Sequence, residues 1–113
     1  MTAATPAPSV PAAVSTPVPA STPASAPLWR QGWCSLARAV PSPNFGPRPA
    51  HTAVDLLVLH SISLPPGEYG GPYIEQLFTN TLDFEAHPYF QSIRGLQVSA
   101  HFVVRRDGSI LQF

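Results

Sequence analysis

The run Asp55-Leu-Leu-Val-Leu-His60 decides how this 113-residue sequence is interpreted. Its consecutive apolar residues, bounded by Asp55 and His60, are typical of a short strand buried on both faces of a sheet. A loop rich in proline and glycine follows at once, over residues 61–72. Because mixed α/β proteins often place their chemistry where a buried strand opens into a structured loop, His60 is the first candidate functional residue. The alternative is a partly buried structural histidine whose ring nitrogen is satisfied.

The charge and cysteine content narrow the class of protein. Six basic residues balance six acidic ones, so the formal net charge is zero. This composition lacks the positive footprint of nucleic-acid or anionic-membrane binding, and no apolar run approaches the roughly 20 residues of a membrane-spanning helix. The single cysteine, Cys34, has no internal disulfide partner, and its apolar context favours a packed residue over a nucleophile. We therefore expect a cytoplasmic protein with neither nucleic acid nor membrane as a partner.

Residues 1–27 differ in composition from the rest of the chain. They consist almost wholly of Ala, Pro, Ser and Thr and carry no charged side chain. Such a segment has too little apolar surface to offset the entropy of ordering it, which predicts a disordered tail. A linker role and a misassigned start codon are alternatives. The folded part is expected over residues 28–113.

Local patterns within residues 28–113 predict a small domain of the α/β class. Asp107-Gly108 is the strongest hairpin signal in the sequence. The sequence ends within the strand that follows it, so we expect the sheet to be truncated. The other predicted elements are an extended lead-in or short strand over residues 28–40, a helix over 72–78 with Pro72 at its first position, a second helical turn over 83–94 and strands over 97–106 and 109–113.

The four histidines and one loop glutamate are the remaining candidates for chemistry. His51 is interpreted as solvated and His87 as structural, and the histidine spacing matches no local metal motif. His60 and His101 both fall on predicted strands, so they approach one another if those strands are neighbours. Glu68, in the loop after His60, is either a general base or simply solvated. From these residues alone the function stays open.

A longer series of residues resembles a known family. The matching residues are Gly32-Trp33, Ala37-Arg38, Pro41-Ser-Pro-Asn44, Arg48-Pro49, Leu56-Leu-Val-Leu-His60, Ile62-Ser-Leu-Pro-Pro-Gly-Glu68, Gly70-Gly-Pro72, Leu77-Phe78, His87-Pro88, Val98-Ser-Ala-His101 and Arg106-Asp-Gly108. Through them the chain is similar, over about residues 28–113, to the AmpD-type 1,6-anhydro-N-acetylmuramyl-L-alanine amidases, which are zinc enzymes of the amidase/peptidoglycan-recognition fold. The resemblance implies an α/β (α+β) fold in which helices flank a mixed sheet. It also implies hydrolysis of the amide between N-acetylmuramic acid and L-alanine of anhydromuropeptides in cytoplasmic cell-wall recycling.

The same resemblance assigns roles to single positions. It implies that His60 is the first of three zinc ligands and that Ser61, where the family commonly has Asn, and His101 line or support the substrate cleft. The family's other zinc ligands and its catalytic acid/base residues come after the position that matches Phe113, so no catalytic residue is expected within this chain. We therefore expect the 113-residue chain to be an inactive N-terminal part of an amidase. A non-catalytic muropeptide-binding module and a truncated, inactive gene product are the rival hypotheses.

Overall fold

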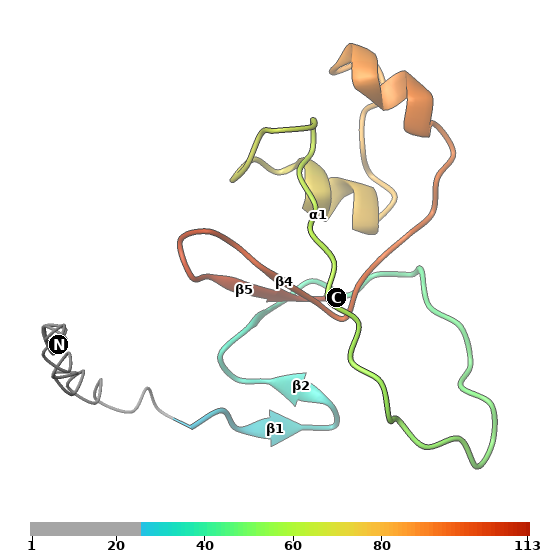
Figure 1. The fold of residues 1–113 in the computed structure, drawn as a ribbon, viewed down its shortest axis with the longest axis vertical. Coiled ribbons are helices and arrows are strands. Elements are labelled where there is room, and N and C mark those ends of the chain that lie inside the picture. Colours follow the sequence, from blue (N-terminus) through green and yellow to red (C-terminus); the bar gives the residue numbers. More distant parts are fainter. Residues whose placement is uncertain (1–25) are drawn as a thin grey trace, which may run out of the picture.

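The computed structural model describes residues 26–113. The predicted tail, residues 1–27, therefore lies almost wholly outside the described residues, and the boundary at residue 28 stays a prediction. The elements follow in the order β1 (Trp29–Arg30), β2 (Trp33–Cys34), β3 (Arg38–Ala39), α1 (Tyr73–Phe78), the 3₁₀ helix η1 (Pro88–Ile93), β4 (Phe102–Val104) and β5 (Ile110–Gln112) (Figure 1).

The strands form two small sheets. β1 and β2 pair antiparallel around Gln31 and Gly32, both of which have positive φ, as a tight hairpin turn requires. The second sheet has the strand order β3-β5-β4, in which β3 runs parallel and β4 antiparallel to β5. The predicted mixed sheet is confirmed. The predicted lead-in over residues 28–40 is more elaborate than expected, because it forms a hairpin and then a third strand.

The hairpin of β4 and β5 forms as its turn residues predict. Gly108 has a φ of 85°, which an L-residue adopts at a cost, and the backbone of Arg105 pairs with that of Ser109 across the turn. The side-chain carboxylate of Asp107 accepts hydrogen bonds from the backbone N–H and hydroxyl of Ser109. The first strand is shorter than the predicted 97–106, since ladder pairing covers only Phe102–Val104.

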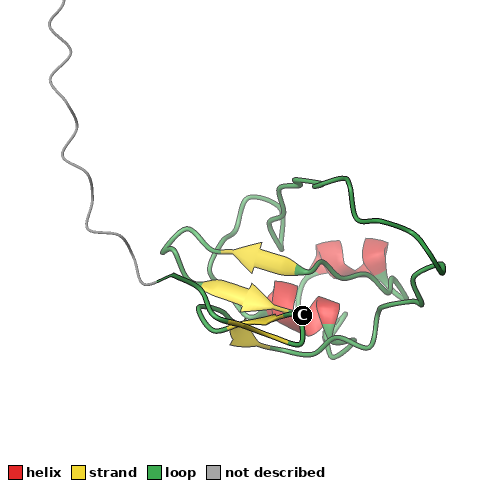
Figure 2. Ribbon diagram, turned by 90° about the horizontal axis from the view of Figure 1, so that it is seen from below, coloured by secondary structure: helices red, strands yellow, loops and turns green. Residues whose placement is uncertain are grey.

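The two helices lie on one side of the mixed sheet (Figure 2). Helix α1 agrees with the predicted span to within a residue, except that Pro72 is the N-cap rather than the first helical residue, and Asn80, at a φ of 60°, follows its end. The second predicted helical turn is η1, whose cap is the ring Nδ1 of His87, 3.1 Å from the N–H of Tyr89. A structural role for His87 agrees with this contact.

The hydrophobic core lies between the helices, the loop after residue 61 and the mixed sheet. Its fully buried member is Phe90 of η1, whose ring packs edge-on against Tyr73 of α1 at 5.0 Å. Phe113 packs edge-on against Phe78 at the same distance and so joins α1 to the end of β5. The remaining buried members of the cluster are Leu64, Leu77 and Leu82.

The predicted buried strand over residues 55–60 is wrong for this structure. These residues form no strand, and each of them is exposed. They belong to a wide loop between β3 and α1, whose residues 46–61 are all exposed (Figure 1). The apolar pattern reports a tendency to be buried, but a strand also needs a hydrogen-bonded neighbour, and no described strand lies beside this run. His60 is therefore at no strand end here.

Candidate functional site

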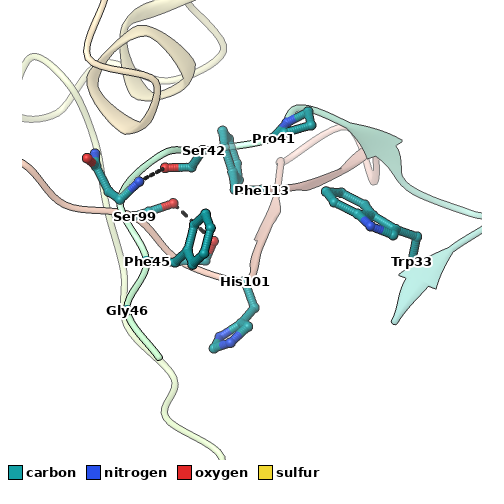
Figure 3. A pocket seen from close by; sticks show the side chains of 10 residues that line it. Trp33, Pro41, Ser42, Phe45, Gly46, Ser99, His101 and Phe113 are labelled. Atoms are coloured by element: carbon teal, nitrogen blue, oxygen red, sulfur yellow. Dashed lines mark hydrogen bonds between the residues drawn. The ribbon is translucent and has the colours of Figure 1, made fainter. Parts of the chain in front are cut away.

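A cavity of about 390 Å³ opens between residues 41–46, residues 99–101 and the end of β5 (Figure 3). Its walls carry three aromatic rings, those of Trp33, Phe45 and Phe113, together with the imidazole of His101. Aromatic walls with a few polar groups are typical of sites that bind small organic ligands. Of the residues predicted from the sequence as functional, His101 lines this cavity, whereas His60 and Ser61 do not.

Asn44 and Ser42 hold one wall of the cavity in place. The amide Nδ2 of Asn44 donates to the carbonyl of Val98 at 2.9 Å and lies 3.3 Å from the carbonyl of Phe78. The same amide exchanges hydrogen bonds with Asn80, and the hydroxyl of Ser42 donates to the carbonyl of Phe78. The segment around Phe45 is thereby fixed to the end of α1 and to the extended segment that leads to His101.

Gln112 holds the opposite wall, which contains Trp33. Its side chain is buried, accepts from the N–H of Cys34 at 2.7 Å and donates to the carbonyl of Gly32 at 2.6 Å. The backbone carbonyl of the same residue accepts from Val40 at 2.7 Å. One residue of β5 thus orients the β1–β2 hairpin. Cys34 is buried beside it, as its apolar context predicted.

An ion-pair cluster joins the mixed sheet to α1. The guanidinium of Arg38 in β3 makes two hydrogen bonds to the carboxylate of Glu75 in α1, at 2.5 and 3.1 Å, and Arg105 lies 3.7 Å from it. These hydrogen bonds, together with the charges of both arginines, hold the pKa of Glu75 below its ordinary value. Glu75 is therefore ionised and structural at neutral pH, and it faces the arginines rather than the cavity.

The loop after His60 is shaped by its own short contacts. Ser63 accepts from the N–H of Gly67 at 2.8 Å, and the guanidinium of Arg106 lies 3.6 Å from the ring centre of Tyr69. This stack attaches the loop to the β4–β5 turn. Glu68 is exposed, which agrees with the interpretation of a solvated side chain.

The described residues do not assemble a zinc site. Within residues 26–113, no three His, Cys, Asp or Glu side chains come together as a group able to hold a metal ion. His60 is exposed in the wide loop and lies outside the cavity that contains His101. A protein zinc site needs three or four ligands converging at about 2 Å. Among the described residues His60 is the one candidate ligand, and a single ligand does not fit a zinc centre.

Sequence reasoning missed most of the cavity. Phe45, Phe113 and the buried amide of Gln112 were not candidates, because each is brought to its place by contacts with residues far away in the sequence. A signal was available for Asn44, because it follows two prolines and precedes an aromatic residue, a pattern that is typical of an ordered turn.

Among the described residues no helix has the length and apolar character needed to cross a bilayer.

Comparison with known proteins gives consistent matches. Residues 50–113 match the family model for N-acetylmuramoyl-L-alanine amidase. The 1,6-anhydro-N-acetylmuramyl-L-alanine amidase AmpD of Escherichia coli (strain K12) is 56% identical over 86 residues, which are 76% of this chain and 47% of that protein. The protein of the same name from Haemophilus influenzae is 42% identical over 83 residues, or 74% of this chain and 45% of that protein.

The solved structures agree with the sequences. A crystal structure of a selenomethionine derivative of AmpD superposes with a TM-score of 0.73 at 56% identity, covering 76% of this chain and 48% of that one. This likeness supports the α+β architecture described above. The chain spans about half the length of the curated relatives that it matches.

Proposed function

This chain belongs to the N-acetylmuramoyl-L-alanine amidase family, and from that premise we propose that it is part of a hydrolase acting on 1,6-anhydromuropeptides. The bond cleaved is the amide between N-acetylmuramic acid and L-alanine. The observation that carries the proposal is the 56% identity to the E. coli protein named for this activity. We place the reaction in cytoplasmic cell-wall recycling, with the muropeptide as the partner.

The proposal includes zinc as the cofactor of the whole enzyme, with His60 as the ligand that this chain supplies. The ligand role rests on the family resemblance. A second element of the proposal is that the 113-residue chain does not hold zinc tightly by itself, because His60 is the single ligand that the resemblance assigns to it. A lone imidazole binds zinc weakly, because affinity comes from several ligands held in place together.

The residues of this chain would then serve binding rather than bond cleavage. We assign the cavity around His101 to the substrate cleft, where the aromatic rings of Trp33 and Phe45 offer apolar contact to sugar and methyl groups. Ser61 is assigned to the same cleft on family resemblance. No catalytic acid or base is assigned within the chain.

The first test measures hydrolysis and metal binding by the 113-residue chain. We expect no release of peptide from an anhydromuropeptide, with or without added zinc, while the full-length E. coli relative releases it under the same conditions. Calorimetric titration with zinc is expected to show no saturable tight site. Turnover that a chelator abolishes would contradict the proposed inactivity of the isolated chain.

A non-catalytic muropeptide-binding module is the second candidate, and the cavity favours it. Its volume of about 390 Å³ lies within the range of about 300–1,000 Å³ that is typical of small-ligand pockets. Trp33 lines this cavity, so its fluorescence should change when a ligand binds. Saturable quenching by an anhydromuropeptide without zinc, weakened by Phe45→Ala but not by Gln97→Ala, would support this reading.

A further inference from the structure

A second cavity, of about 250 Å³, lies where the loop over residues 61–72 meets the turn between β4 and β5. It is lined by Tyr69, Gly70, Arg105, Arg106 and Asp107. The space beside Gly70 is open, because a Cβ added there would meet no atom beyond its chain neighbours within 4 Å. The β4–β5 turn lies at the end of the hairpin away from Phe113, so this cavity is separate from the one around His101 (Figure 1).

The guanidinium of Arg106 presents unused hydrogen-bond donors to the second cavity. Its central carbon lies 3.6 Å from the ring centre of Tyr69, so the ring covers one flat face of the guanidinium. The N–H groups lie in the plane of the guanidinium and point away from the ring. Among the described residues the arginine side chains that donate hydrogen bonds are Arg38 and Arg94, so those of Arg106 are left for a ligand or for water.

No acidic side chain of this chain neutralises Arg106. The ion pairs among the described residues involve Arg38, Arg94 and Arg105, and residues 1–25 contain no Asp or Glu. Asp107 is next in the sequence, but its carboxylate accepts hydrogen bonds from the N–H and hydroxyl of Ser109 and so holds its own turn.

The charges that line the second cavity favour a ligand with a single negative charge. Arg105 is the second cation, with a side chain that is 26% exposed and lies 3.7 Å from the carboxylate of Glu75. Two arginines and Asp107 leave the lining with one net positive charge. A dianion would exceed that charge and would be repelled by the carboxylate of Asp107.

We propose that the second cavity binds a single carboxylate group, carried by a small acid or by the end of a peptide, through the guanidinium of Arg106. The planar fork of a guanidinium matches a carboxylate with two parallel hydrogen bonds, which a lysine cannot provide. Arg105 adds a second positive charge beside the bound group. This site goes beyond the proposed amidase function and does not depend on it.

Both sides of the second cavity are held in place before a ligand arrives. On the loop side, Ser63 accepts from the N–H of Gly67 at 2.8 Å, and the N–H of Glu68 donates to the carbonyl of Pro65 at 2.9 Å. On the turn side, the N–H of Gly108 donates to the carbonyl of Arg105 at 3.0 Å. A site that is already ordered loses less conformational entropy on binding.

The test is an NMR titration of the 113-residue chain at constant ionic strength, so that screening of charges does not change. The probes are propionate, acetyl-alanyl-alanine with a free carboxylate, the amide of the same dipeptide, and inorganic phosphate. We expect saturable shifts of the backbone amide of Gly70 and the side-chain Nε of Arg106 with both carboxylates, and none with the dipeptide amide. Tighter binding of the dipeptide than of propionate would assign the carboxylate to a peptide.

Two substitutions locate the site. Arg106→Gln removes the charged fork and should weaken carboxylate binding by about tenfold or more, and Arg106→Lys, which keeps the charge but not the fork, should fall between. Arg48→Gln, which removes an exposed arginine of the wide loop, is the matched control and should leave the affinity unchanged. Unchanged amide shifts of the core residues Leu77 and Phe90 confirm that each variant is folded.

Three results would overturn the proposal. Equal weakening by Arg106→Gln and Arg48→Gln would mean general attraction of anions to surface cations. Binding of the dipeptide amide as tightly as of the free acid would remove the carboxylate from the recognition. Phosphate that binds more tightly than propionate would contradict a site for a single negative charge. None of these results bears on hydrolysis, so the proposed function stands or falls separately.

Discussion

At the scale of single residues, the side chain of Gln112 connects segments that are about 80 positions apart in the sequence. Its amide bonds to the backbone of Gly32 and of Cys34, and its own backbone lies in β5. A buried amide is stable only when its polar atoms are paired, and here both are. The orientation of the β1–β2 hairpin, and with it the Trp33 wall of the cavity, therefore depends on this one residue.

Gln112→Leu tests that dependence. The substitution keeps the volume roughly constant but leaves the N–H of Cys34 and the carbonyl of Gly32 without partners, so the free energy of unfolding should fall by about 2 kcal/mol. Urea denaturation measures the loss, and hydrogen exchange at Cys34 should accelerate. Gln97→Leu, at an exposed position, is the control and should change stability little. Equal stability of the two variants would contradict the assigned role.

At the scale of elements, the helix and the hairpin agree with prediction because their signals are local. The apolar spacing of Ile74, Leu77 and Phe78 marks one face of α1, and Asp107-Gly108 specifies the turn between β4 and β5. The contacts between elements are not local. Arg38 of β3 meets Glu75 of α1 across 37 positions of sequence, and no pattern indicated that pair.

The pair of Arg38 and Glu75 predicts a dependence of stability on pH. Because the hydrogen bonds from Arg38 hold the pKa of Glu75 below its ordinary value near 4.5, the folded state binds this proton less readily than the unfolded state. The stabilisation is present above that ordinary value and is lost as the pH falls through the lower pKa of the folded state.

Glu75→Gln should therefore reduce the free energy of unfolding at neutral pH, and the difference from the unchanged chain should vanish in acid. Denaturant titrations across the acidic range measure this difference. Glu85→Gln is the comparison, since the pKa of Glu85 is also lowered, by Gln91 and Arg94, but its exposed side chain lies in the turn before η1 and joins no sheet to a helix. A pH-independent difference for Glu75→Gln would contradict the pairing.

At the scale of the whole molecule, the chain divides into a packed body and an uncovered apolar loop. The body gathers the core around Phe90 and Leu77, whereas the loop over residues 46–61 contributes nothing to it. Apolar side chains left in water favour association, so the loop makes the isolated chain prone to aggregate.

A substitution in the exposed loop and one in the core should differ in their effect on the free energy of unfolding. Leu57→Lys replaces a side chain that is 80% exposed, so the free energy of unfolding should stay within about 0.5 kcal/mol while aggregation decreases. Leu77→Ala removes a buried side chain and should cost about 2–5 kcal/mol. Thermal melting with light scattering measures both quantities. A large destabilisation by Leu57→Lys would mean that the loop packs onto the body in solution.

The metal-ligand role of His60 stays a prediction. The sequence by itself determined the family, helix α1, the β4–β5 hairpin and the packed Cys34. Each of these follows from neighbouring residues or from a motif that can be recognised in order along the chain. Only the tertiary structure decided that residues 55–60 remain unpaired, that His101 lines the aromatic cavity without His60, and that Gln112 orients the N-terminal hairpin. The reason is physical, because a strand and a cavity are made by hydrogen bonds and contacts between segments that are distant in the sequence. A local pattern of apolar residues indicates that these side chains tend to be buried, but it does not specify which segment buries them.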